Sequence, residues 1–358
     1  VISPVSMKKI ESLVLVGSCL AFLVFIGTSY YFLCSILNAP VNLSNELQLD
    51  SKNRYLFSIE KGTNLKRVND ELSHKKILSS AFLVTSWARA LNKHQVKAGD
   101  YWISSSDTAK TLMEKFGQGH IAQHSITFPE GWSFNQWLSK LAEIPQFAVI
   151  NDLNHRQLLD QAGIDLYHPE GWFFPDTYYY SKNTTIFTLL KQAHKRMRAE
   201  LDIAWKSKDD NLPYTTSYEA LIMASIIEKE TGQANERTEI SGVFVRRLKQ
   251  GMRLQTDPTV IYGMGDDYDG NIRLRDLRAY TAYNTYRIYG LPPTPIAMPG
   301  LASIEAALHP KSGSSLYFVA RGDGSHHFSD TISEHQEAVR KFQIDQRVKN
   351  YQSTPQQP

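Results

Sequence analysis

The hydrophobic pattern divides the chain into an apolar N-terminal run and a longer region of short hydrophobic periods separated by polar turns. Residues 13–37 carry no charge and are mostly Leu, Val, Ile, Phe, Tyr and Cys. A helix needs about 20 apolar residues to cross a bilayer at 1.5 Å rise per residue. The pattern therefore predicts a transmembrane helix over residues 12–37, after a cytoplasmic N-terminus over residues 1–11.

The charges around this run predict its orientation. Lys8 and Lys9 precede it and only Glu11 opposes them, so the positive-inside rule keeps the N-terminus in the cytoplasm and exports the remainder. A cleaved signal peptide and a lipidation box at 16–19 are the alternatives. The apolar run continues well past Cys19, which favours a spanning anchor. Met7 is the expected start.

The pattern after the anchor predicts a small βα module over residues 54–122. A polar linker is expected over residues 38–53. Tyr55–Ile59 alternates like a strand, and Leu65, Val68 and Leu72 share one helical face. Thr63 or Asn64 is the expected N-cap of that helix. A second helix is expected over residues 80–91, a turn and strand over 97–103, and a capped helix over 106–116.

Residues 123–345 are expected to form a larger mixed α/β domain, so that the whole chain is α+β. Amphipathic helices are predicted over Thr185–Glu200, Tyr218–Glu230 and Glu236–Lys249. Residues 251–263 are expected to be loop and strand, and residues 280–286 and 290–296 to be loops at a binding cleft. The tail, residues 346–358, is expected to be disordered.

Three segments open alike, with an acidic turn followed by glycine. Gly62 follows Glu60 and Lys61, Gly131 follows Glu130, and Gly171 follows Glu170. Each segment is expected to lead through the turn into a cap and helix. The simplest interpretation is three similar turns, each of which requires glycine for its backbone conformation.

Composition and charge exclude several classes. The chain has 358 residues, of which 42% are hydrophobic and 21% charged, and its net charge is +3. We expect no nucleic-acid binding, because the charge is small and there is no basic stripe, P-loop or GxGxxG motif.

Both cysteines, Cys19 and Cys34, lie in the apolar run, so the exported part has no disulfide, no cysteine nucleophile and no thiolate metal site. No cofactor and no metal are expected, since the spacing of the C-terminal histidines matches no zinc motif; these are His309, His326, His327 and His335.

Two carboxylates at the end of an apolar helical run are the candidate acids. Glu228 and Glu230 follow residues 220–227, which are almost entirely apolar. Glu230 stacks over Ile226 and Ile227, on the more hydrophobic face, whereas Glu228 stacks over small residues. Burial and the negative end of the helix dipole both favour a protonated Glu230, which would then donate a proton near neutral pH. A solvent-facing helix end is the alternative.

Aromatic residues cluster in sequence before this helix. The cluster suits carbohydrate, because sugar rings present apolar faces, although core packing explains such residues equally well. Its members are Trp132, Trp137, Trp172, Phe173, Phe174, Tyr178, Tyr179 and Tyr180.

Five segments in order resemble one family. They are residues 170–177 (EGWFFPDT), 224–231 (ASIIEKET), 252–263 (MRLQTDPTVIYG), 281–286 (TAYNTY) and 290–293 (GLPP). Together, from the anchor to about Phe342, the chain resembles the endolytic murein transglycosylases, the MltG or YceG-like family. The resemblance implies that residues 54–122 are a LysM-like subdomain in contact with glycan. It also implies that the second carboxylate, Glu230, is the catalytic acid, with Glu228 as fallback or support.

The resemblance further implies a reaction and its surroundings. A lytic transglycosylase cleaves the MurNAc–GlcNAc β-1,4 bond of nascent glycan without water and leaves 1,6-anhydroMurNAc ends, which would terminate elongation. The implied location is the inner (cytoplasmic) membrane with the catalytic domain in the periplasm, and the implied partners are peptidoglycan strands and penicillin-binding peptidoglycan synthases. Substrate contacts are expected from Arg253, Gln255, Asp257, Tyr283, Asn284, Thr285, Tyr286 and Glu170.

Two other functions remain open. One is a lysozyme-like hydrolase that uses Asp257 or Glu170 as a second carboxylate. The other is a scaffold that binds peptidoglycan without cleaving it. Product mass separates the first from a transglycosylase, and carboxylate variants that behave as wild type would indicate the second.

Overall fold

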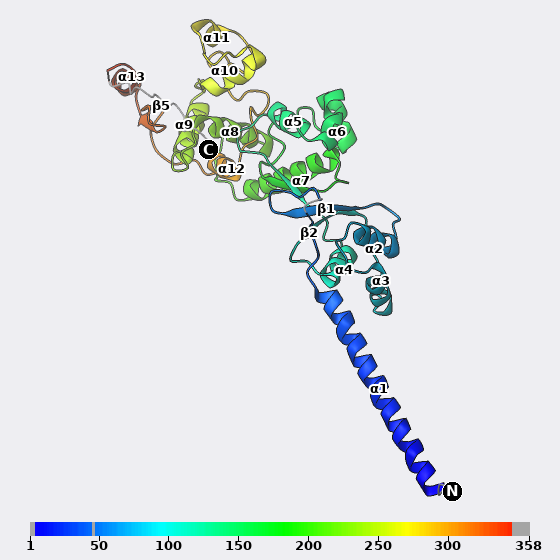
Figure 1. Ribbon diagram of the computed structural model, residues 1–358. Coiled ribbons are helices and arrows are strands. Elements are labelled where there is room, and N and C mark those ends of the chain that lie inside the picture. The colour runs from blue at the N-terminus through cyan, green and yellow to red at the C-terminus, as the bar shows by residue number, and fades with distance from the viewer. Residues whose placement is uncertain (1–3, 45–46, 346–358) are drawn as a thin grey trace. The chain divides into compact units, whose positions relative to one another are not determined.

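The computed structural model describes residues 4–44 and 47–345 and forms two compact units (Figure 1). The first runs to His124 and takes in Tyr179–Asn183, and the second holds Ser125–Tyr178 and the chain from Thr184 onward. The expected disordered tail lies outside the described residues.

The first unit begins with one long helix, α1 (Pro4–Asn38). Within the described residues, Leu15–Asn38 is the one helix long and apolar enough to cross a membrane. Tyr30 and Tyr31 on this helix are exposed, as residues of a lipid-facing surface would be.

A small α/β module follows α1, with the elements that the pattern predicts. The strands β1 and β2 pair antiparallel, with Tyr55 opposite Ile103, and share one hydrophobic core with the three helices. Asn64 is the N-cap of the first of these helices, and Leu65, Val68 and Leu72 are buried on its inner face. The elements are β1 (Arg54–Ile59), α2 (Leu65–His74), α3 (Ala81–Ala90), β2 (Gly99–Ser104) and α4 (Ala109–Gln118).

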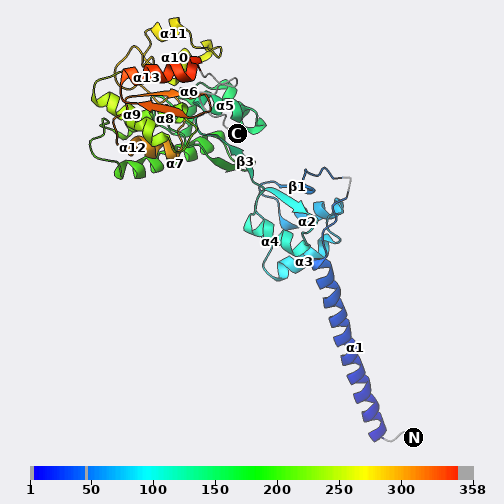
Figure 2. The same ribbon diagram turned by 90° about the vertical axis from the view of Figure 1, so that its left-hand side faces the viewer.

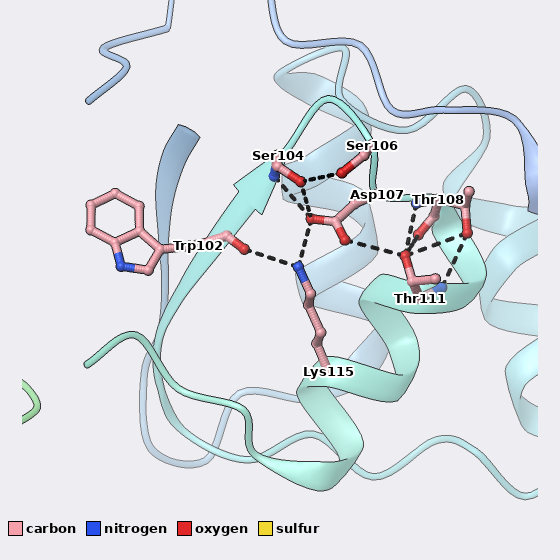
Figure 3. Close-up of polar contacts among 7 residues, drawn as sticks. All are labelled: Trp102, Ser104, Ser106, Asp107, Thr108, Thr111 and Lys115. Carbon is pink, nitrogen blue, oxygen red and sulfur yellow. Dashed lines mark hydrogen bonds and ion pairs between the residues drawn. The ribbon is translucent and has the colours of Figure 1, made fainter. Parts of the chain in front are cut away.

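The end of α1 is built into this module. Leu37 and Val41 are buried in the module's core, and the Val41 N–H donates to the Asp107 carbonyl at 2.8 Å. The Asp107 carboxylate in turn accepts from the Ser104 N–H at 2.9 Å and from Lys115 Nζ at 2.7 Å (Figure 3). Residues 38–44 therefore belong to the module and are not a separate linker, because apolar residues among the polar ones pack on its core.

The second unit is mainly helical, with short two-stranded sheets. The pairs are β3 with β4 and, antiparallel, β5 with β6, and helix α13 packs on the β5–β6 pair (Figure 2). The elements up to α8 are β3 (His124–Thr127), α5 (Phe134–Ala142), η1 (Pro145–Asp152), α6 (His155–Ala162), β4 (Thr177–Tyr180), α7 (Ile186–Lys206) and α8 (Ser217–Glu230). Those after it are α9 (Arg237–Lys249), α10 (Asp257–Met264), η2 (Gly265–Asp267), α11 (Leu274–Arg278), α12 (Leu301–Leu308), β5 (Tyr317–Ala320), β6 (His326–Ser329), α13 (Ile332–Val339) and η3 (Arg340–Asp345).

Helix α8 is the centre of this unit. It packs against α7, α9, α10 and α12, and every residue from Ala220 to Glu228 is buried. The prediction of an amphipathic helix is therefore wrong for α8. A helix that is apolar almost all round is one that neighbouring elements enclose.

Two details of the expected secondary structure differ in this unit. Residues 257–264 form helix α10 instead of a strand, because Pro258 fits the first turn of a helix and Asp257 is favourable at its N-terminus. The three glycine turns share positive φ values of 87°, 76° and 82° at Gly62, Gly131 and Gly171. The third turn, however, leads into strand β4 and not into a helix.

Candidate active site

A cleft of about 1430 Å³ runs through the second unit, past the C-terminal end of α8. Its walls come from the first turn of α5, from the loop around Glu170, from α10 and from the β5–β6 pair. The polar side chains among its lining include Ser133, Asn135, His155, His168, Glu170, Lys229, Glu230, Asp257, Tyr262, Tyr283, Tyr286, His326 and His335.

Glu230 is the last residue of α8 and lines this cleft. The helix ends because the backbone of Thr231, its C-cap, is extended, with φ −143°. The Thr256 hydroxyl donates to Oε1 of Glu230. Burial raises the pKa of Glu230 to about 7, and the Asp257 carboxylate adds to this, whereas Thr256 and Arg247 lower it. A carboxyl group with such a pKa can give and take a proton near neutral pH.

Glu228 has a different environment, although it lies two residues away. It is buried, and its Oε2 accepts from the Gly300 N–H at 3.1 Å and from the Ser303 hydroxyl at 2.7 Å. These groups are the N-cap and third residue of α12, so Glu228 caps that helix from α8. Glu228 is not among the residues that line the cleft. Glu228 is therefore the more buried of the two carboxylates. Its environment differs from that of Glu230 because of its contacts with α12 and not only because of the helical face on which it lies.

A group of threonines lies behind Glu230. Thr256, Thr259 and Thr285 are all buried. The Thr256 N–H donates to Thr285 Oγ1 at 3.0 Å, and the Thr259 and Thr285 hydroxyls are 2.8 Å apart. The Thr285 carbonyl also accepts from the Gln255 N–H at 3.2 Å. Thr285 therefore holds the segment that contacts Glu230 and is itself out of reach of a ligand.

The loop before α10 is held by a buried arginine. Arg247 Nη1 donates to the Leu254 carbonyl at 2.9 Å and to Gln255 Oε1 at 3.4 Å. Gln255 is exposed and has φ 55°, a conformation that is unfavourable for a side chain of this kind. Arg253 lies over the ring of Tyr289, 4.6 Å from its centroid. Neither Arg253 nor Gln255 lines the cleft in this conformation.

Asp257 and Tyr286 form a pair on the wall beside Glu230. The Tyr286 hydroxyl donates to Asp257 Oδ1 at 2.6 Å. Burial raises the pKa of Tyr286, as do the nearby charges of Asp257 and Glu230. The tyrosine is therefore a neutral donor, and Asp257 is the expected second carboxylate whose charge acts on Glu230.

Glu170 connects two walls of the cleft. Its Oε1 accepts from the Phe134 N–H in the first turn of α5 at 2.9 Å, and its Oε2 accepts from the Tyr262 hydroxyl of α10 at 3.1 Å. The side chain is buried, which raises its pKa to about 7. The Tyr262 ring meets the Tyr283 ring edge-on, with centroids 5.0 Å apart. Because both oxygens are engaged, Glu170 is placed as a structural bridge with little surface left for a substrate.

Asn284 is completely buried and serves the backbone. Its Nδ2 donates to the carbonyls of Asp276, Leu277 and Ala279, and its Oδ1 accepts from the Tyr286 N–H at 3.0 Å. The amide therefore holds the end of α11 and places Tyr286. Of the residues expected to touch substrate, those that line the cleft are Glu170, Asp257, Tyr283 and Tyr286, and those that do not are Arg253, Gln255, Asn284 and Thr285.

The C-terminal histidines lie in separate pairs. His326 Nδ1 is 2.8 Å from Glu236 Oε2, and His309 Nδ1 is 2.7 Å from Asp209 Oδ1. His335 stacks on Tyr317. Among residues 4–44 and 47–345, no group of three His, Cys, Asp or Glu side chains could hold a metal ion.

The aromatic cluster is divided between core and surface. Trp137, Phe173, Phe174 and Tyr178 are buried, whereas Tyr179 is exposed. Trp172 is half-buried and stacks on Tyr218 with ring centroids 5.5 Å apart. None of the eight residues lines the cleft, so the expected sugar-binding role has no support at this site.

The expected site residues omitted three side chains of this region, of which Lys229 and Tyr262 line the cleft and Thr256 lies behind Glu230 without lining it. Thr256 contacts Glu230, Tyr262 contacts Glu170, and Lys229 donates from Nζ to the Gly131 carbonyl at 3.2 Å. Thr256 and Tyr262 lie in the polar segment 252–263 and Lys229 lies between the two glutamates, so their position in the motifs was the available signal.

Comparison with known proteins agrees with the resemblance. A family model described as the YceG-like family matches residues 57–341. The chain is 28% identical over 320 residues to the endolytic murein transglycosylase of Bacillus subtilis, and the match covers 84% of this chain and 88% of the relative. It is 26% identical over 363 residues to the protein of that name from Streptococcus pneumoniae, and spans 64% of that relative's length.

A solved structure is also similar to this chain. The crystal structure of a putative YceG-like protein from Listeria monocytogenes aligns with a TM-score of 0.51 at 27% identity, and covers 80% of this chain and 100% of the other. The family match extends over far more than half of the sequence and includes both units. The chain therefore belongs to the YceG-like family.

Proposed function

We propose that this protein is an endolytic peptidoglycan transglycosylase in which Glu230 is the single catalytic acid and base. The observation that carries the proposal is the state of Glu230, which lines the cleft at the end of α8 with a pKa raised to about 7. The relatives from Bacillus subtilis and Streptococcus pneumoniae are both named endolytic murein transglycosylase, which supports the same reaction class here.

The proposed reaction cleaves the MurNAc–GlcNAc β-1,4 bond in two proton transfers. Protonated Glu230 gives its proton to the glycosidic oxygen, and the bond from that oxygen to MurNAc C1 breaks. The C6 hydroxyl of the same MurNAc then attacks C1 and returns its proton to the Glu230 carboxylate. The products are a 1,6-anhydro end and a GlcNAc with a free 4-hydroxyl, so no water is consumed and Glu230 is regenerated.

The neighbouring carboxyl groups support one-carboxylate chemistry. A hydrolase of the usual kind needs a second carboxylate that is free to activate water or to attack C1. Glu170 has both oxygens in hydrogen bonds and a pKa raised to about 7. Asp257 accepts from Tyr286 and favours protonated Glu230 by charge. We assign Glu170 to the architecture of the cleft and Asp257 to the tuning of Glu230.

Substrate contact is assigned to residues that face the cleft. Asp257, Tyr283 and Tyr286 can offer hydroxyl and carboxylate groups to the sugars. Asn284 and Thr285 are completely buried and are assigned to placing Tyr286 and Thr256. Gln255 is exposed next to Thr256 and stays a candidate for an acetamido group, and Arg253 stays a candidate for a neighbouring sugar.

The proposed setting follows from the anchor and the module. We infer that α1 is a single-pass anchor in the inner membrane, with the N-terminus cytoplasmic, residues 54–122 a LysM-like module and residues 123–345 the catalytic domain in the periplasm. Near newly made strands, cleavage would terminate glycan elongation, in company with penicillin-binding synthases. A cysteine-labelling assay on spheroplasts, with an impermeant reagent and single cysteines before and after α1, tests the orientation.

Mass spectrometry of reaction products tests the activity. Purified wild type acting on glycan strands should release products with anhydro ends, each lighter by one water than a hydrolysis product. Glu230→Gln should lose this activity, and Glu228→Gln is the matched control on the same helix. Products with reducing ends would indicate the hydrolase, and binding without cleavage by the wild type would indicate the scaffold.

A further inference from the structure

We propose that Thr256 is a positioning residue for Glu230, which fixes one carboxyl oxygen and leaves the other to carry both proton transfers. This inference rests on the proposed function for its chemistry, but its geometry stands on the Thr256–Glu230 contact alone. The Thr256 side chain is buried, and its hydroxyl donates to Oε1 of Glu230.

The position of Thr256 in the fold is the first argument. Thr256 is the N-cap of α10, where a threonine hydroxyl normally accepts from a free N–H of the first helical turn. Thr256 makes no such bond, although side-chain caps are present at other helices of the same chain. Examples are Asn64, Ser80, Thr108, Ser133, Asn154, Thr185, Thr216 and Thr331. Thr256 therefore contacts a carboxylate that is distant in sequence and does not cap its own helix with its side chain. Such a departure from the local pattern is typical of residues at functional sites.

The backbone around Thr256 is held from two sides. Its N–H donates to Thr285 Oγ1 at 3.0 Å, and its carbonyl accepts from the Thr259 hydroxyl at 2.8 Å. The preceding residue, Gln255, has φ 55°. Its N–H donates to the Thr285 carbonyl, and its Oε1 accepts from Arg247 Nη1. These contacts fix the backbone of Thr256, from which its hydroxyl reaches Glu230. A hydroxyl group held in this way orients a carboxylate without being rearranged during the reaction.

The reaction explains why one oxygen should be held. In the proposed mechanism the same carboxyl group first donates to the glycosidic oxygen and then accepts from the C6 hydroxyl, so it must face the same substrate throughout. With Oε1 occupied by Thr256, Oε2 is the oxygen left for both transfers. The Thr256 hydroxyl donates to the ionised form, so it also stabilises the carboxylate after the first transfer.

Several charged and titratable groups act on Glu230. Asp257 of α10 raises its pKa, Arg247 of α9 and the Thr256 hydroxyl lower it, and Tyr286 lies close enough to be affected by its charge. Removal of the Thr256 hydroxyl alone should therefore raise the pKa of Glu230 further, while Asp257, Arg247 and Tyr286 stay in place.

The experiment compares Thr256→Val, Thr256→Ser and wild type by two readouts. The first is a 13C NMR titration of the Glu230 carboxyl group in substrate-free protein, assigned through Glu230→Gln. Thr256→Val should raise the pKa of Glu230 by about one unit, and Thr256→Ser should restore it, since hydrogen bonds to a charged group have about this effect. Thr85→Val is the matched control, because Thr85 is a buried hydroxyl that bonds Asn69 in the other unit.

The second readout is the pH dependence of kcat for anhydro-ended product. Thr256→Val should lower kcat about 10-fold or more and move the pH profile to higher pH, and Thr256→Ser should recover most of both effects. A Glu230 titration that is identical in wild type, Thr256→Val and Thr256→Ser would overturn the proposal. If the titration shifts but wild type releases no anhydro product, the contact stands and the proposed function fails. Thermal unfolding of each variant identifies a loss that comes only from misfolding, which Thr256→Ser is expected to avoid.

Discussion

The Ser303 hydroxyl of α12 donates to Oε2 of Glu228 at 2.7 Å, and this contact joins two central helices of the second unit. With the Gly300 N–H on the same oxygen, Glu228 is a cap for α12 provided by α8. The end of α8 is thereby fixed, and Glu230 with it. The two carboxylates therefore have different roles, since Glu228 stabilises the packing of α8 with α12 and Glu230 lines the cleft.

Replacement of Glu230 should remove the activity without loss of the fold. Glu230→Gln cannot donate a proton, so release of anhydro-ended glycan should fall about 10²–10⁴-fold. Glu228→Gln keeps an acceptor for Gly300 and Ser303 and should retain activity within about 10-fold. Initial rates on purified strands measure both, and equal losses in the two variants would contradict the assignment.

The pH profile of the wild type should follow the protonated form of Glu230. Because the pKa is raised to about 7, the rate should fall as the pH rises through neutrality. Asp257→Asn removes a negative charge that raises this pKa, so the alkaline limb should move to lower pH. Rates at saturating substrate, measured over a series of pH values, give the pH at which the alkaline limb falls. A limb that stays in place in Asp257→Asn would show that Asp257 does not act on Glu230.

The same pKa has a consequence for stability. The pKa of Glu230 is about 7 in the folded protein, against an ordinary value of 4.5. The stability that protonated Glu230 contributes is therefore fully present below pH 4.5 and is lost as the pH rises through 7. Glu230→Gln does not titrate at this position. Its free energy of unfolding relative to that of wild type should therefore increase by about 2 kcal/mol between pH 4.5 and 7, a figure reduced for the partial exposure of Glu230. Urea unfolding across this pH range measures the difference, and parallel curves would argue against the raised pKa.

The cap that Glu228 forms should be measurable as a coupling. Glu228→Ala leaves two donors at the start of α12 without their acceptor and should cost about 2–3 kcal/mol. Ser303→Ala should cost about 1 kcal/mol. A double-mutant cycle of the two isolates their interaction, and a coupling near zero would mean that the hydroxyl contact contributes nothing.

The glycine beside Glu170 should be hard to replace by alanine. Gly171 has φ +82°, and an added Cβ would lie 2.5 Å from the Pro295 ring. Gly171→Ala should therefore lower the free energy of unfolding by about 3 kcal/mol. Gly251→Ala is the matched control, since Gly251 has φ +64° with nothing within 4 Å of an added Cβ. It should cost about 1 kcal/mol from backbone strain alone, and equal losses would contradict the role of the Pro295 contact.

The sequence by itself determined the local features of this protein. The uncharged run predicted α1, Asn64 as a candidate N-cap predicted the start of α2, and the helix predicted over Tyr218–Glu230 ends where α8 ends. Each of these depends on neighbours within a turn or two of the chain. The choice of Glu230 also came from the sequence, through the apolar residues one turn before it.

The tertiary structure decided which polar groups meet. Residues 251–263 were expected to be loop and strand, and Pro258 and Asp257 instead begin α10, whose N-cap contacts Glu230. Asn284 and Thr285 looked like ligands for sugar, but they are buried against backbone groups. Thr256 and Glu230 are 26 residues apart, and Glu228 and Ser303 are 75 apart. Contacts at such separations depend on how whole helices pack, which no local period or cap encodes.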